Sequence, residues 1–154
     1  MKKTILAFSA LILMLILPFR ASATGDARLL RFPDINNNLI AFVYAGDIWT
    51  VSSIGGEARR LTSHKGLELF PKISPDGQWI AFSGEYSGSR QVFIIPSNGG
   101  VPRQLTWYNS VGVMPPRAGW DNVILDWMPD SKQILIRANR TSFGERNGKY
   151  FHKR

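Results

Sequence analysis

Short apolar runs of four to six residues alternate with turn-forming residues along the chain from residue 29 onward. The runs are rich in Ile, Val, Phe and Trp, and Pro-Asp-Gly, Gly-Gly or Ser-Gly bounds them. This pattern is typical of β-strands joined by tight turns, and no apolar period of helix length occurs beyond residue 23. It predicts an all-β chain with strands near residues 39–44, 47–52, 58–62, 79–84, 91–96, 102–106 and 133–138. The alternation within these runs predicts a core that contains Ile40, Phe42, Ile80, Phe82, Ile134 and Ile136.

The apolar runs belong to a repeat of about 40 residues. The segment Phe32-Pro33-Asp34-Ile35 and the run after it return as Phe70-Pro71-Lys72-Ile73 and the run after that. The Gly-Gly turns at 55–56 and 99–100 are each followed by a similar short segment that ends in Leu-Thr. A third copy opens at residue 125. The chain therefore contains two full units and the start of a third.

Each unit has the composition of four short strands, and this is typical of a β-propeller blade. In the turn Pro75-Asp76-Gly77, proline presets one backbone dihedral and glycine accepts a left-handed one, so Asp76 and its counterpart Asp130 are expected to accept turn hydrogen bonds. The prediction is about two and a half four-stranded antiparallel blades. Blade 1 spans about residues 29–62, blade 2 spans 67–106, and blade 3 begins within 120–154.

The interval between the second and third units is longer than the first, and the extra residues fall in 107–122. This segment is rich in proline and glycine, which predicts a loop between two blades. Loops at blade edges carry binding groups in many propellers. Tyr108, Arg117 and Trp120 are the candidate contacts for a peptide, by stacking and by charge. The alternative is a packed structural excursion with no binding role.

The first 23 residues have the features of a secretory signal peptide. Lys2 and Lys3 precede an apolar run, and the small residues Ala21-Ser22-Ala23 match a signal peptidase site. The thirteen-residue run 5–17 is shorter than the roughly 20 residues of a membrane-spanning helix. Cleavage after Ala23 would leave residues 24–154 as an exported, periplasmic protein without a stable membrane anchor. The alternative is an uncleaved membrane anchor.

The formal charge of +8 changes meaning once this segment is set aside, because three of the basic residues lie within it. From 24 to 136 the charges balance, and the remaining excess of +5 lies in residues 137–154. A basic tail can bind nucleic acid or a membrane surface. The signal peptide disfavours nucleic acid as a partner, and the aromatic residues between the charges favour an ordinary strand and turn.

Candidate catalytic chemistry is sparse. The chain has no cysteine, its histidines are His64 and His152, and no Gly-x-Ser-x-Gly elbow occurs. Ser87 fits a hairpin turn better than a nucleophile. The aspartates are scattered one per turn or strand end, so they give no local support for a metal loop. We therefore predict no catalytic, cofactor-binding or metal-binding residues and no cofactor.

Four segments together resemble the opening blades of tricorn-type proteases: residues 31–35, 42–49, 55–62 and 69–77. The resemblance runs from about residue 29 to residue 150. It implies a six-bladed propeller, followed in the full-length family members by a second propeller and a PDZ-bearing serine peptidase region. The nucleophile and base of that family have no matching position here. The Pro-Asp-Gly repeats also resemble TolB-like periplasmic propellers and the propellers of prolyl-oligopeptidase relatives.

The function implied by this resemblance is the non-catalytic, substrate-gating portion of an exported tricorn-like serine peptidase. The implied partners are peptide or unfolded protein substrates, which the complete propeller would meet, and the remainder of the same polypeptide. A homo-oligomeric parent is also implied. The alternatives are a TolB-like interaction propeller and the propeller of a prolyl-oligopeptidase relative.

Overall fold

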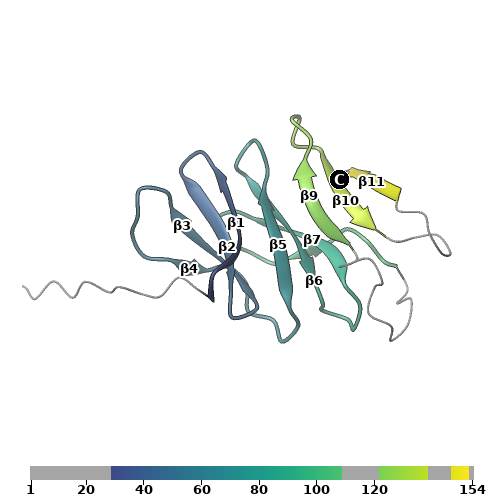
Figure 1. Ribbon diagram of the computed structural model, residues 1–154, viewed down its shortest axis with the longest axis horizontal. Coiled ribbons are helices and arrows are strands. Elements are labelled where there is room, and N and C mark those ends of the chain that lie inside the picture. The colour runs from purple at the N-terminus through teal and green to yellow at the C-terminus, as the bar shows by residue number, and fades with distance from the viewer. Residues whose placement is uncertain (1–28, 109–121, 139–146, 153–154) are drawn as a thin grey trace, which may run out of the picture.

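The computed structural model describes residues 29–108 and 122–138, and the backbone of 147–152. It confirms the all-β prediction, because eleven strands and no α-helix occur in these described ranges. The strands form three antiparallel sheets that follow one another along the chain (Figure 1). Their bounds are β1 Arg31–Asn36, β2 Leu39–Tyr44, β3 Asp47–Ser52, β4 Arg59–Arg60, β5 Glu68–Ile73, β6 Trp79–Gly84, β7 Gln91–Pro96, β8 Arg103–Gln104, β9 Val123–Trp127, β10 Gln133–Ala138 and β11 Asn147–His152.

Each sheet is a simple meander, as expected for a propeller blade. The strand orders are β1-β2-β3-β4 in sheet 1, β5-β6-β7-β8 in sheet 2 and β11-β10-β9 in sheet 3. The first strands of the three sheets are neighbours, since β5 contacts both β1 and β9. The sheets therefore stack face to face in chain order, with their first strands on a common side (Figure 1).

The repeated Phe-Pro pair produces a β-bulge in the first strand of sheets 1 and 2. The register with the next strand shifts between Arg31 and Asp34 in β1, and between Leu69 and Lys72 in β5. Phe32 and Phe70 have positive φ angles of 50° and 56° at these bulges. Their rings lie 4.4 Å apart. The bulges thus join the first strands of two sheets by a direct aromatic contact.

Two hydrophobic cores hold the stack together. One lies between sheets 1 and 2, and the other lies between sheets 2 and 3. In β6 the side chains alternate between them, so that Ile80 and Phe82 face sheet 1 while Ala81 faces sheet 3. This two-sided burial explains why the strands of sheet 2 read as nearly continuous apolar runs.

Hydrogen bonds from side chains add to these cores at the first strands. Asp34 of β1 accepts bonds from the Lys72 ammonium and the Ile73 amide of β5, each at 2.7 Å. On the other side of β5, the Trp127 indole Nε1 donates to the Lys72 carbonyl at 2.8 Å. Polar contacts therefore fix the offset between neighbouring sheets, which apolar packing alone leaves free to slide.

The predicted strands are confirmed, but two are shorter than expected and four strands were not predicted. Residues 58–62 and 102–106 form ladders only at 59–60 and 103–104, at the edges of their sheets. The strands β1, β5, β9 and β11 lie in segments for which the alternation predicted none. The turn prediction is confirmed, since Asp76 and Asp130 accept bonds from the amides two residues further on.

The prediction for Ile40 is wrong, since this side chain is only half-buried. The other five predicted core residues are buried. Ile40 lies on the face of sheet 1 that points away from sheet 2, across from Ile35 and Val51, and Phe42 lies opposite Trp49 on the same face. These side chains lie outside the core that joins sheet 1 to sheet 2. We call this apolar surface, formed by Ile35, Ile40, Phe42, Trp49 and Val51, the outer face of sheet 1.

Candidate functional site

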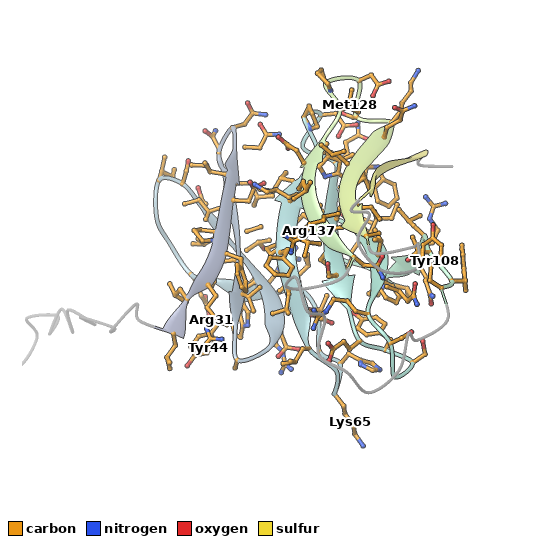
Figure 2. All side chains as sticks on the ribbon, turned by 45° about the vertical axis from the view of Figure 1, so that its right-hand side comes forward. Arg31, Tyr44, Lys65, Tyr108, Met128 and Arg137 are labelled. Carbon is orange, nitrogen blue, oxygen red and sulfur yellow. The ribbon has the colours of Figure 1, made fainter. Side chains whose placement is uncertain are left out.

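Several connections between strands gather at one end of the stack. The register places the β2–β3 turn, the β4–β5 connection and the β6–β7 turn at the same end, because Tyr44 pairs with Asp47 and Glu68 pairs with Gly84. Figure 2 shows Tyr44, Arg31 and Lys65 toward this end, with Met128 at the opposite one. We call it the Tyr44 end.

A cavity of about 320 Å³ opens at the Tyr44 end between sheets 1 and 2. Its walls come from the start of β1, the β2–β3 turn and the start of β5, and they are mainly apolar. Val43 and Leu69 are buried, whereas Leu29 and Leu67 are partly open to solvent. Gly46 has a φ angle of +91°, and an added Cβ would lie 3.4 Å from the Leu67 side chain, so this turn suits glycine. The cavity can receive an apolar side chain, and Arg31 lines it beside these apolar groups.

A buried carboxylate lies beside this cavity. Glu68 is fully buried, and its Oε2 accepts hydrogen bonds from the Thr62 hydroxyl and, at 3.1 Å, from the Ile48 amide. Its Oε1 accepts a 2.5 Å bond from the Tyr86 hydroxyl. Burial raises the pKa of Glu68, and the nearby negative charge of Asp47 adds to the effect. Burial and the neighbouring Glu68 raise the pKa of Tyr86 as well.

Asp47 is a second buried carboxylate in the same place. Its Oδ2 forms a 2.7 Å ion pair with Arg60. Its Oδ1 is buried and has no hydrogen-bond partner among the described residues. The His64 ring lies 4.1 Å from the Tyr86 ring, and its Nδ1 accepts a bond from the Gly66 amide. The arrangement holds acids, a phenol and an imidazole, but it places no serine against the imidazole as a catalytic triad would.

The candidate peptide-contact loop is only partly described. Tyr108 lies at its start, where Gln91 holds both polar groups of its backbone: Oε1 accepts from the Tyr108 amide at 3.1 Å and Nε2 donates to its carbonyl at 2.7 Å. Arg117 and Trp120 lie outside the described residues. The loop therefore leaves sheet 2 from an anchored position at the Tyr44 end, and its role in peptide binding stays a prediction.

Neither a metal cluster nor a membrane-spanning helix occurs in the described residues. Within residues 29–108 and 122–138, no three His, Asp or Glu side chains gather as a metal site would require. The described part of the chain also contains no helix of the length and apolarity needed to cross a membrane. His152 lies in β11, of which only the backbone is described.

Comparison with known proteins places this architecture in a family. The model of the tricorn protease N-terminal β-propeller domain matches residues 27–152. The chain belongs to this tricorn N-terminal propeller family. The tricorn-type chain is 34% identical over 82 residues to Tricorn protease homolog 1 of Streptomyces coelicolor, covering 53% of the chain and 8% of that protein. It is 30% identical over 114 residues to the Tricorn protease homolog of Saccharolobus solfataricus, covering 73% of the chain and 10% of that protein.

Solved structures agree on the fold of the tricorn-type chain. The crystal structure of the tricorn protease matches with a TM-score of 0.60 at 21% identity, over 71% of this chain and 11% of that one. The crystal structure of TolB from Acinetobacter baumannii matches with a TM-score of 0.62 at 18% identity, over 79% of this chain and 29% of that one. The three sheets are therefore β-propeller blades. The chain spans a tenth or less of the length of the two curated relatives.

Sequence reasoning missed the acidic group at the Tyr44 end of the tricorn-type chain. It treated Asp47 as one of several scattered aspartates and did not single out Glu68 or Tyr86. A signal was present, because Glu68 stands directly before an apolar strand and aligns with the polar residue Asn122 of the next repeat. A charged residue at a position that begins a buried strand needs partners, and the sequence alone does not reveal them.

Proposed function

We propose that this chain is the opening, non-catalytic part of a six-bladed propeller that gates peptide entry in an exported tricorn-like serine peptidase. The observation that carries the proposal is the outer face of sheet 1. The residue of sheet 2 that is equivalent to Ile35 is Ile73, which is 5% exposed in the core with sheet 1, whereas Ile35 on the outer face is 63% exposed. Trp49 adds a buried indole Nε1 with no hydrogen-bond partner among the described residues.

A face built in this way needs a covering partner, because each Å² of apolar surface removed from water contributes about 25 cal/mol. We propose that the remainder of the same polypeptide supplies it, as a further blade that packs on sheet 1 in the manner of sheet 1 on sheet 2. Family membership supports this assignment, since two of the matching relatives are ten or more times longer than the matched region. The Tyr44 end, with its cavity and the loop that begins at Tyr108, would then face the peptide.

The coding sequence that follows Arg154 in the genome tests the parent protein. Further blades followed by a PDZ-bearing serine peptidase region would support the proposal. Further blades alone would favour the TolB-like interaction propeller, and an α/β-hydrolase with Gly-x-Ser-x-Gly would favour a prolyl-oligopeptidase relative. The TolB-like alternative has its own support in the structural match to TolB, which reflects the fold.

Two assays test the remaining parts of the proposal. The purified chain should not cleave casein or fluorogenic peptides, because no nucleophile and base are paired in the described residues. Turnover that survives His64→Ala and His152→Ala would contradict this. Export predicts that the protein recovered from the periplasm begins at Thr24. An intact N-terminus at Met1 in the cytoplasmic fraction would contradict the signal peptide.

A further inference from the structure

The two junctions between the sheets use the same three positions with different chemistry. At the junction of sheets 1 and 2 these are Asp47, Thr62 and Glu68, and at the junction of sheets 2 and 3 they are Gln91, Thr106 and Asn122. The threonines accept in the same way, since each hydroxyl accepts a 2.9 Å bond from the amide that follows the first position, at Ile48 or Val92. Two acids at one junction therefore replace two amides at the other.

The amide junction is fully satisfied without ionisation. Gln91 Oε1 accepts a 2.7 Å bond from the Thr106 hydroxyl, and its Nε2 donates to the Ser89 hydroxyl and the Tyr108 carbonyl. Asn122 Nδ2 donates a 2.5 Å bond to the Arg90 carbonyl. An amide donates and accepts at once and does not titrate, so these bonds do not depend on pH.

The acid junction holds more negative charge than its neighbours balance. Arg60 from β4 forms an ion pair with Asp47, and the Arg60 side chain is half exposed to solvent. The other groups that face the pair are the Tyr86 hydroxyl from the β6–β7 turn and, behind it, the His64 ring from the β4–β5 connection. Glu85 next to Tyr86 is occupied by its ion pair with Arg90. Asp47 Oδ1 is buried without a donor among the described residues.

We propose that the junction of the first two blades is a proton-operated joint, in which a proton bound by Glu68 beside Asp47 tightens sheet 1 on sheet 2 and its loss loosens them. A proton on Glu68 removes one of two like charges from a buried site. The joint is also coupled to the cavity, because the Glu68 amide donates a 2.9 Å bond to the carbonyl of Gly46, which lines it.

The direction of the pH effect on stability follows from the pKa of Glu68 in the folded and unfolded states. Burial raises the pKa of Glu68 in the folded chain above the value of 4.5 that it has when exposed. The stabilisation by the bound proton is therefore fully present below pH 4.5 and is lost as the pH rises through the folded-state pKa. Each unit of pKa difference corresponds to a tenfold change in the equilibrium between the closed and open joint.

Hydrogen exchange of the full chain from pH 4 to pH 8, corrected for intrinsic exchange rates, tests the joint. Protection at the Ile48 and Glu68 amides should fall across this range, while protection at Val92 stays level. Glu68→Gln copies the amide junction and should abolish the fall. Asn122→Asp is the matched variant and should create a new pH dependence at Val92. Equal pH dependence at both junctions, or a fall that survives Glu68→Gln, would overturn the proposal.

A measurement on the unaltered chain keeps the test independent of how the variants fold. The side-chain carboxyl carbon of Glu68, followed by NMR as the pH is raised, should titrate above 4.5. A midpoint at or below that value would also overturn the proposal. Neither measurement depends on peptide gating, so the joint and the proposed function can fail separately.

Discussion

Phe82 offers the sharpest test of how the first two blades are held together. Its side chain is fully buried in the core between sheets 1 and 2. The ring stacks on Phe93 with centroids 5.7 Å apart, and the Tyr86 ring lies at 6.2 Å. Gly84 makes room for this group, because an added Cβ would lie 3.0 Å from the Phe93 ring and 3.3 Å from the Phe82 ring.

Phe82→Ala removes the ring from this site and leaves a cavity that two packed sheets cannot close. Substitutions of this kind cost about 3–5 kcal/mol. This is a large part of the roughly 5–15 kcal/mol by which a domain is stable. With a urea slope of about 2 kcal/mol per molar, the unfolding midpoint should fall by about 2 M.

Urea unfolding of the dilute chain, followed by tryptophan fluorescence, measures this shift. Val101→Ala is the matched control, since Val101 is 87% exposed and its truncation should change stability by less than about 0.5 kcal/mol. A midpoint for Phe82→Ala that coincides with that of Val101→Ala would refute the packing argument. A smaller slope without a midpoint change would show that the two sheets unfold separately.

Three other predictions follow from the contacts described above. Asp34→Ala should destabilise the chain by about 1–3 kcal/mol in thermal unfolding, because the Ile73 amide loses its acceptor, and a change no larger than that of Asp130→Ala would contradict this. Because the pKa of Tyr86 is raised in the folded chain, the stability that its neutral phenol contributes is present below pH 10.0 and is lost as the pH rises further. Tyr86→Phe cannot ionise, so the variant should lose less stability at alkaline pH. An alkaline unfolding midpoint that is the same in Tyr86→Phe would count against this. The outer face of sheet 1 should cause concentration-dependent self-association that Ile35→Ser reduces, and sedimentation velocity that shows a monomer at all concentrations would exclude this.

The sequence alone determined most of the strands, the turns and the repeat, because these depend on neighbours close along the chain. Alternation of apolar residues marked β2, β3, β6, β7 and β10, and Pro-Asp-Gly marked the turns at Asp76 and Asp130. The blade architecture followed, because a meander of short strands that recurs about every 40 residues has few ways to bury its faces. The resemblance to tricorn-type propellers rested on the same repeated segments, and the family match confirms it.

Only the tertiary structure decided which face of each strand is covered and which polar groups meet. Alternation assigns Ile40 and Ala41 to opposite faces, but it cannot show that only the face with Ala41 receives another sheet. Asp47, Thr62, Glu68 and Tyr86 come from separate turns and strands, and their meeting depends on the stacking of sheet 2 against sheet 1. The electrostatics of that group arise from burial, which is a property of the packed sheets and not of any one segment.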